Sequence, residues 1–451
     1  MSESPTLTGS GGIEVPRDKG LVARLLSPIA DVRDDEVLSA LLMTLTMFLI
    51  LAGYYLLKTA REQFILSEGG AEVKSYSSAG QAVLLLFLVP AYGAFASKVN
   101  RVQLIQWVTL FFVANLGLFL VALWAGLRIG IVYFIWVGIF NVMVIAQLWA
   151  FANDLYTEDQ GKRLFPLIGV GSSLGAWFGS MRAGTLVQSF GPSRLLLGGA
   201  AILIICIALT RIVDRVSTSG GASQAKRSTD KLEGGKGGFA MILSDRYLML
   251  IAVLVLVLNV VNTTGEYLFG RYVVQAAQQL SSDPATRQAY IGETYSSYFS
   301  YVNFIGFVLQ MFVVSRVFKV LGVGRTLFIH PIVVLSGYLI MLKAPSFDAI
   351  RWLKVADNSI DYSLGNTTKQ ALWLPTSREA KYKAKQAVDS FCMRAGDVVQ
   401  AGIVYAGELV NLSTGGFVAV GAAFAFGWLS VAFGLRNQLA ARARASGRTE
   451  L

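Results

Sequence analysis

The stretch LSALLMTLTMFLILAGYYLL, residues 38–57, contains no charged side chain. A helix of this length, rising about 1.5 Å per residue, crosses the ~30 Å hydrocarbon core of a bilayer. Similar runs recur along the 451-residue chain, which is 54% hydrophobic, 15% charged and has a mean hydropathy of +0.55. Soluble proteins carry about 25% charged residues. Because only helices and closed barrels satisfy the backbone in lipid, and these runs do not alternate, they predict an all-α integral membrane protein.

The apolar runs predict about twelve transmembrane helices in two sets of six, separated by a polar segment. The first set is Leu38–Leu57, Gly80–Ala96, Leu104–Gly126, Ile129–Phe151, Leu164–Val187 and Leu195–Leu209. The second set is Tyr247–Phe269, Tyr295–Val314, Thr326–Leu342, Ile350–Leu374, Ala384–Leu409 and Gly416–Leu435. The predicted domains are a tail (1–36), a first half (37–212), a Gly/Ser/Lys-rich flexible linker (213–245), a second half (246–436) and a tail (437–451).

The basic residues predict how the chain is oriented. With a cytoplasmic N-terminus, about 25 Lys and Arg fall in cytoplasmic segments and about 8 in external ones. We therefore expect both termini and the linker on the cytoplasmic side of a bacterial inner membrane. The net charge of +11 then reflects topology and not a nucleic-acid-binding face.

The two sets of spans resemble each other. GYYLL at 53–57 closes the first predicted span and GEYLF at 265–269 closes the seventh. SKV at 97–99 follows the second span and SRV at 315–317 follows the eighth. Parallel six-helix repeats of this kind are typical of the major facilitator fold, in which substrate binds between pseudo-symmetric halves near the membrane midplane.

Residues that build metal or catalytic centres are scarce. Cys206 and Cys392 lie in apolar runs, and the only histidine, His330, is interpreted as a packing or solvated residue. We therefore expect no metal, no cofactor and no enzymatic activity. The glycines of GVGSSLG, residues 169–175, lack the ending of a phosphate loop. Gly171, Gly175 and Gly179 instead follow the small-residue spacing of close helix packing.

Several charges lie where a membrane span should be, at a cost of at least ~2.5 kcal/mol each at the bilayer centre. Lys58, Arg61 and Glu62 follow the first span on one helix face, either as part of a site or as a snorkelling cluster. Glu266 and Arg271 occupy the corresponding place in the seventh span, where they could simply pair with each other.

The tenth and eleventh spans carry the strongest signal of this kind. Asp357 and Asp361 share a helix face, and Lys369 follows about two turns later. This set should line a cavity, although a purely structural ion-pair network stays an alternative. The eleventh span adds Asp389, Arg394 and Asp397.

Four segments in both halves resemble the ATP/ADP translocase (nucleotide transporter) family of plastids and intracellular bacteria. YYLLKTARE at 54–62 is similar to the family's Tyr-Asn-Ile-Leu-Arg-Asp-Thr-Lys-Asp, and LWAFAND at 148–154 to its Trp-Gly-Phe-Ala-Asn-Gln. KRLFPLIG at 162–169 resembles its Arg-Phe-Tyr-Pro-Leu-Phe-Gly. YSLGNTTKQ at 362–370 resembles its Tyr-Ser-Leu and Thr-Lys-Glu.

The resemblance implies roles for individual residues. Arg61 stands where the family has a phosphate-facing lysine, Glu266 matches the acid of the seventh span, and Lys369 and Asp389 match directly. Two departures concern the substrate. Residues 137–147 lack the family's fourth-span glutamate, and Asp397 replaces a lysine, with Arg394 as a cation three residues earlier.

These observations predict a secondary transporter that moves nucleotides, by ATP/ADP-type exchange, or a related phosphate-bearing anion. Its expected partners are the lipid bilayer and a small anionic substrate, and no nucleic acid. The alternatives are a proton-coupled facilitator of a non-nucleotide metabolite and a non-transporting subunit that scaffolds a protein partner through its linker or tails. The predicted substrate-binding residues are Lys58, Arg61, Asn153, Glu266, Lys369, Asp389 and Arg394. The predicted gating or proton-coupling residues are Arg271, Asp357, Asp361 and Asp397.

Overall fold

The computed structural model describes residues 21–27, 30–96, 101–219, 237–343, 346–377 and 379–445. Within these ranges the chain forms helices and no β-strand, which confirms the all-α fold. Eight of the helices in this part of the chain are long and apolar enough to cross a membrane by length and composition. The larger number of about twelve spans stays a prediction.

The helices of the N-terminal half follow one another with short connections. They are α1 (Leu21–Leu26), α2 (Val37–Ala96), α3 (Arg101–Trp124), α4 (Gly130–Phe140), α5 (Ala146–Leu155), α6 (Glu158–Phe190) and α7 (Ser193–Ser219). A π-helical turn, Asn141–Ile145, joins α4 to α5.

The C-terminal half contains more π-helical turns. Its helices are α8 (Gly238–Ser244), α9 (Arg246–Leu280), α10 (Pro284–Val308), α11 (Val314–Thr326), α12 (Ile329–Met341), α13 (Phe347–Ile360), α14 (Asn366–Ala371), α15 (Lys385–Ala387), α16 (Met393–Leu409) and α17 (Thr414–Ala445). The π-helical turns are Leu309–Val313, Asp361–Gly365, Ala380–Ala384 and Val388–Cys392.

The segment α2 contains the first two predicted spans, 38–57 and 80–96, and the residues between them are helical as well. It is helical from Val37 to Ala96, and its one break is Gly70, whose φ of 74° lies in the left-handed region that glycine tolerates. The helix therefore continues past Leu57 and carries Lys58 and Glu62 into the protein, where they are 9% and 1% exposed. This burial rules out the snorkelling interpretation of the first charge cluster.

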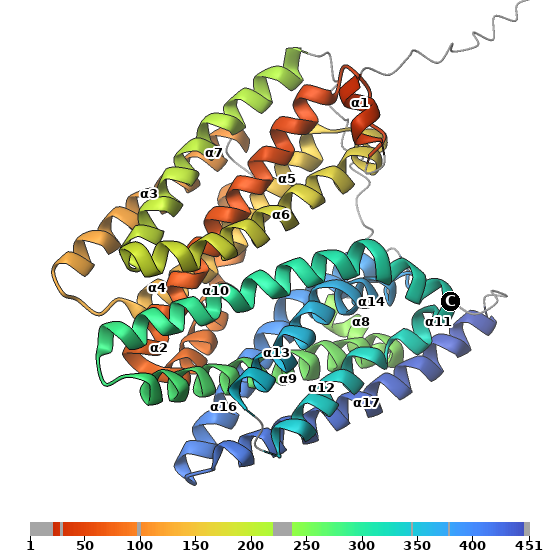
Figure 1. Ribbon diagram of the computed structural model, residues 1–451. Helices are drawn as coiled ribbons and strands as arrows, with labels where there is room; N and C mark the ends of the chain where they lie inside the picture. Colours follow the sequence, from red (N-terminus) through yellow and green to blue (C-terminus); the bar gives the residue numbers. More distant parts are fainter. Residues whose placement is uncertain are drawn as a thin grey trace, which may run out of the picture.

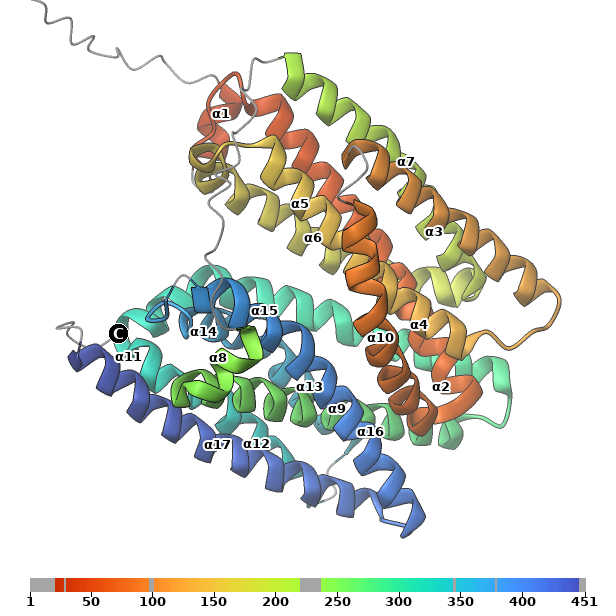
Figure 2. The ribbon, with the colours of Figure 1, turned by 180° about the vertical axis from the view of Figure 1, so that it is seen from behind.

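The two halves lie side by side (Figure 1), and they meet where α6 packs on α10 and where α2 packs on α9, α10 and α16. Toward the end that bears α1 and the C-terminus of α17, the helices of the halves diverge, and the view from behind shows the same divergence (Figure 2). The helix α1 and the C-terminal end of α17 thus lie at the same end of the molecule.

The glycine stripe of α6 packs against the first part of α2, as the spacing predicts. A Cβ atom at Gly171 would lie 2.6 Å from the Thr44 side chain. At Gly175 and Gly179 it would overlap the backbone of Phe48 and Ala52. The absence of side chains lets the two helices approach closely within the first half.

The predicted linker is bordered by helix on both sides. Residues 213–219 belong to α7 and residues 238–244 form α8, so the stretch between them, 220–236, lies outside the described residues. The same holds for residues 97–99 of the sequence repeat, for 1–20 and for 446–451. The matching segments 53–57 and 265–269 lie within α2 and α9.

Candidate functional site

A cavity of about 210 Å³ lies between the two halves, and side chains from α2 and α9 supply most of its polar lining. Three cations of α2 and one acid of α9 border it: Lys58, Arg61, Lys74 and Glu266. Its other lining residues are Ser75, Ser78, Gln81, Phe134, Asn262, Thr263, Tyr267, Phe299, Asn358, Tyr362 and Gln400. The sequence-predicted cations Lys58 and Arg61 thus meet the predicted acid Glu266 at one place.

Lys58 faces aromatic rings instead of a carboxylate. Its Nζ lies 4.3 Å from the ring centre of Phe299 and 5.1 Å from that of Tyr55. Within the described part of the chain, no carboxylate oxygen lies within 4.0 Å of it. A cation over desolvated aromatic faces gains about 2 kcal/mol, less than the cost of leaving a charge unpaired away from water. Lys58 is therefore placed to receive an anion.

Arg61 and Lys74 share one buried carboxylate, that of Glu62. The Arg61 guanidinium contacts Glu62 Oε1 at 2.5 Å, and Lys74 Nζ lies 2.8 Å from Glu62 Oε2. Lys74 Nζ also lies 3.6 Å from Glu266 Oε2, an ion pair that joins the two halves. With Lys58 included, the N-terminal side of the cavity holds three cations and a single carboxylate.

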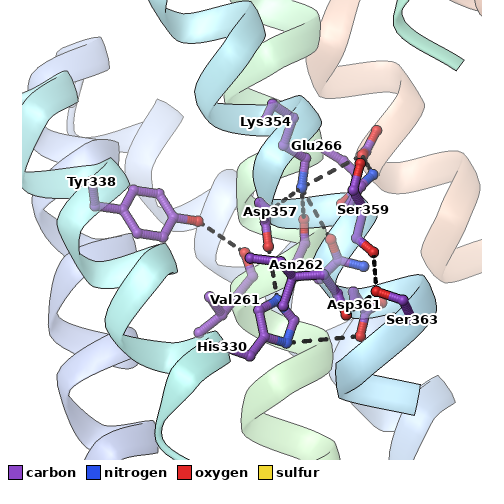
Figure 3. Close-up of polar contacts among 12 residues, drawn as sticks. Val261, Asn262, Glu266, His330, Tyr338, Lys354, Asp357, Ser359, Asp361 and Ser363 are labelled. Atoms are coloured by element: carbon purple, nitrogen blue, oxygen red, sulfur yellow. Dashed lines mark hydrogen bonds and ion pairs between the residues drawn. The ribbon is translucent and has the colours of Figure 1, made fainter. Parts of the chain in front are cut away.

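The C-terminal side holds a network centred on Lys354, a buried residue of α13 (Figure 3). Lys354 Nζ lies 2.8 Å from Asp357 Oδ2, 3.0 Å from Asn262 Oδ1 and 3.5 Å from Glu266 Oε1. Glu266 Oε1 also accepts hydrogen bonds from Asn358 at 2.9 Å and from the Tyr298 hydroxyl at 3.1 Å. Every carboxylate in this network therefore has a cationic or hydrogen-bonding partner.

His330 belongs to the same network, which corrects its interpretation as a packing or solvated residue. Its Nε2 lies 3.0 Å from Asp357 Oδ1, and its Nδ1 lies 4.0 Å from Asp361 Oδ1 (Figure 3). Asp361 opens the π-helical turn that follows α13, and its Oδ1 lies 3.3 Å from Lys369 Nζ. The i, i+4 acids of the tenth predicted span thus flank one imidazole.

A second ion cluster joins the halves near Gly70, at the end away from α1. Arg271 Nη1 lies 2.9 Å from Glu408 Oε1 and 3.8 Å from Glu72 Oε1. It also donates to the Tyr267 hydroxyl at 2.7 Å, and that hydroxyl lies 3.2 Å from Glu72 Oε1. Arg271 therefore pairs with acids of α2 and α16 and not with Glu266.

The remaining predicted residues lie away from the cavity lining. Asp397 accepts a hydrogen bond from Asn259 at 2.8 Å and lies 3.4 Å from Arg394, so these two predicted residues pair with each other. Asp389 pairs with Lys385 at 2.7 Å and is half-exposed. Asn153 is exposed, and its amide donates to the Trp149 carbonyl of its own helix at 2.9 Å.

A second cavity of about 350 Å³ adjoins the first: Tyr362 lines both, and Tyr55 lines the second. Hydroxyls and amides predominate among its polar residues: Ser172, Ser173, Asn303, Gln310, Asn366 and Thr367. The space between the halves is therefore divided into a cationic chamber and an uncharged polar chamber that meet at Tyr362.

Two residues that hold the site together were missed from sequence. Lys74 lies beyond Gly70, in what was predicted as a connection, so its charge looked like that of an ordinary loop residue. Lys354 lies within the tenth predicted span, three residues before Asp357, and this spacing was a usable signal.

At the end that bears α1, each half has an ion pair between an arginine at the end of a candidate span and an acid just outside the spans. Arg163 holds both Glu36 carboxylate oxygens at 2.8 Å. Burial raises the Glu36 pKa, but hydrogen bonds from Arg163, Gln160 and the Arg33 amide outweigh it, so the pKa lies below its usual 4.5. Asp245 caps α9 and pairs with Arg442, and these bonds likewise outweigh burial and lower the Asp245 pKa.

The chain matches proteins of known class across most of its length. The family model for the TLC ATP/ADP transporter matches residues 129–351. ADP,ATP carrier protein 4 of Rickettsia felis is 22% identical, and the alignment covers 86% of this chain and 88% of that protein. ADP,ATP carrier protein 1 of Chlamydia trachomatis is 24% identical, over 69% of this chain and 65% of that one.

Solved structures share the fold at low sequence identity. A POT family peptide transporter matches with a TM-score of 0.62 and 12% identity, over 89% of this chain and 96% of that one. The nucleoside transporter NupG matches with a TM-score of 0.61 and 13% identity, over 88% of this chain and 98% of that one. The chain is thus a multi-pass membrane protein with the major facilitator fold, and its sequence is similar to the TLC ATP/ADP transporter family over residues 129–351.

Proposed function

We propose that the protein is a secondary transporter that moves nucleotides, or a related phosphate-bearing anion, by alternating access. The observation that carries the proposal is the excess of cations in the cavity between the halves, where Lys58 has no carboxylate partner. The names of the curated relatives, which are ADP,ATP carrier proteins, point to the same class of substrate. Charge-assisted hydrogen bonds to phosphate are among the strongest contacts available to such a site.

The two chambers suggest how a nucleotide would lie. Its phosphates would occupy the cationic chamber beside Lys58, Arg61 and Lys74. Its ribose and base would extend past Tyr55 and Tyr362 into the chamber lined by hydroxyls and amides. Sites for ligands of this size measure roughly 300–1,000 Å³, so both chambers together, but not the first alone, offer enough room.

Alternating access requires the halves to rock about this site. In this structure the ion cluster of Glu72, Arg271 and Glu408 holds them together at the end away from α1. If both termini lie in the cytoplasm of a bacterial cell, as the basic residues predict, this conformation is closed toward the outside. Opening the outer side then requires Arg271 to release Glu72.

Nucleotide exchange into proteoliposomes tests the proposal. Vesicles that contain purified protein and internal ADP should accumulate labelled external ATP, and substitution Lys58→Gln should reduce the initial rate at least tenfold. Lys343, exposed just after α12, provides the matched control, because Lys343→Gln makes the same substitution at a lysine outside the cavity. Uptake that is absent in the wild type, or equal in wild type and Lys58→Gln, would contradict the proposal.

A further inference from the structure

We propose that His330 binds a proton and that this proton is taken up together with the anionic substrate, because protonated His330 competes with Lys369 for Asp361. The inference rests on the proposed function for the identity of the anion. It starts from one observation. His330 is the only histidine of the chain and is 6% exposed, and its Nδ1 makes no hydrogen bond with any described residue.

The contacts of the two ring nitrogens assign the tautomer of the neutral imidazole. Asp357 can only accept a hydrogen bond when ionised, so the 3.0 Å contact places the proton of the neutral ring on Nε2. Nδ1 then presents a lone pair toward Asp361 Oδ1, and two acceptors have no reason to approach closer than the observed 4.0 Å. A proton on Nδ1 would turn this repulsive contact into a charge-assisted hydrogen bond.

The backbone leaves room for that approach. A Cβ atom added at Gly365 would lie 3.0 Å from His330 Nδ1 and 3.2 Å from Asp361 Oδ1. The space between the two groups is therefore bordered by a residue without a side chain. A small rotation of Asp361 toward the ring would suffice to close the contact to about 2.8 Å.

The same carboxylate oxygen serves Lys369. Asp361 Oδ1 lies 3.3 Å from Lys369 Nζ, and the lysine side chain is 23% exposed. When Nδ1 carries a proton, Asp361 gains a second cationic partner, and its hold on Lys369 weakens. Lys369 lies one turn beyond Asn366, which lines the second chamber, so a released ammonium group can reach toward the ribose and base of a nucleotide there.

The charged groups around His330 come from several helices. The groups that face it from α13, the following π-helical turn and α14, directly or through a shared partner, are Lys354, Asp357, Asp361 and Lys369, and Lys354 also contacts Glu266 of α9. Two lysines thus oppose three carboxylates. The helix α17 contributes Trp428, whose ring lies 4.8 Å from the imidazole.

The competition links the two ligands thermodynamically. If protonation frees Lys369 for the anion, anion binding must favour protonation by the same factor. ATP should therefore bind with net proton uptake, and its affinity should fall as the pH rises. A transporter with this property carries protons and anions in the same direction.

Nitrogen NMR tests the proton site without any substrate. Because His330 is the only histidine, protein purified without a histidine tag and labelled with ¹⁵N-histidine gives ring signals from this residue alone. At one fixed pH near neutrality, the doubly protonated fraction should be larger in Lys369→Gln and smaller in Asp361→Asn than in the wild type. Asp389→Asn, which removes a carboxylate paired with Lys385, is the matched control and should match the wild type. Equal fractions in wild type and Lys369→Gln would overturn the proposal, even if Asp361→Asn failed to fold.

Calorimetry tests the coupling to the substrate. ATP titrated into the wild-type protein in buffers of different ionisation enthalpy should show uptake of up to one proton. His330→Gln, which keeps a donor for Asp357 but cannot gain a charge, should bind ATP without proton uptake. ATP binding to the wild type without proton uptake would overturn the coupling and leave the proposed function intact. Absence of ATP binding at every pH would instead contradict the proposed function, and the nitrogen spectra alone would then decide on the proton site.

Discussion

The two sides of the central cavity hold buried charges in different proportions. On the N-terminal side, Lys58, Arg61 and Lys74 have the single carboxylate of Glu62 within the same half. On the C-terminal side, Lys354 and Lys369 lie among the carboxylates of Glu266, Asp357 and Asp361. The N-terminal side thus has an excess of cations, and the C-terminal side has an excess of carboxylates.

This difference distinguishes two roles of buried charges, which are costly to place away from water. A buried ion that is fully paired stabilises the conformation it belongs to, and removal of one partner leaves an uncompensated charge. A buried ion without a partner stores unfavourable energy that a ligand of opposite charge can release. We therefore expect substitutions on the two sides to change stability and substrate binding in opposite ways.

The largest effect should follow from Lys354→Met. The substitution leaves Asp357 without its 2.8 Å ion pair and Glu266 without its nearest cation on the same side. Breaking a buried pair in this way costs about 3–5 kcal/mol. Thermal unfolding of the purified protein in detergent should therefore show a large drop in midpoint.

The matched control for that variant is Lys385→Met. Lys385 also pairs with an aspartate on its own helix, Asp389, but both side chains are partly exposed at 27% and 45%. Surface pairs contribute about 0–1 kcal/mol. A similar loss of stability in both lysine variants would show that the Lys354 network does not act as a buried, matched set.

Substitution Lys58→Gln should have the opposite pattern. It removes an unpaired cation, so the unfolding midpoint should stay the same or rise. A charge-assisted bond to phosphate contributes about 1.5–3 kcal/mol, so affinity for ATP should fall about 10- to 150-fold. Equilibrium binding of labelled ATP measures this effect. A lower unfolding midpoint with unchanged affinity would mean that Lys58 is a structural residue.

A smaller effect should follow from Tyr267→Phe at the ion cluster near Gly70. The lost hydroxyl contacts Arg271, Glu72 and Glu408, and one hydrogen bond contributes about 0.5–1.5 kcal/mol. Weakening this closure should increase the outward-open population about two- to tenfold. Labelling of Ser78→Cys by an impermeant thiol reagent, in a chain that lacks Cys206 and Cys392, reports that population. An unchanged labelling rate would show that the cluster does not hold the outer side closed.

The smallest effect concerns pH. Because the Glu36 pKa is lower in the folded than in the unfolded protein, its contribution to stability is present above the unfolded value. That contribution is lost as the pH falls below about 4.5 toward the folded value. The free energies of unfolding of wild type and Glu36→Gln should therefore differ at pH 6, by less than about 1 kcal/mol, and converge near pH 3. A constant difference across this range would contradict the role of the carboxylate.

Much of this picture could be predicted from the sequence. Uncharged runs such as residues 38–57 indicate membrane helices by length alone, and charges such as Asp357 stand out against them. The four-residue spacing of Gly171, Gly175 and Gly179 likewise predicted close helix packing, and the structure shows α2 as the partner. These features are local, so a single segment contains the information.

The parts that could not be predicted depend on distant residues. His330 and Asp357 are 27 positions apart, and nothing in either neighbourhood identifies the other as its partner. Lys74 reaches the cavity only because Gly70 reverses the chain and returns it beside Glu62. Such contacts follow from how helices are arranged in space, which the pattern of a single sequence does not specify.

The central claim is that a phosphate-bearing anion binds against the cation-rich side of the cavity. A cryo-EM map of the protein in lipid nanodiscs with saturating ATP tests it most directly. We predict density for the phosphates within hydrogen-bond distance of Lys58 Nζ, next to Arg61 and Lys74, with the base in the chamber beyond Tyr55 and Tyr362. Phosphate density against Asp357 and Glu266, or a cavity that stays empty when ATP is saturating, would contradict the claim.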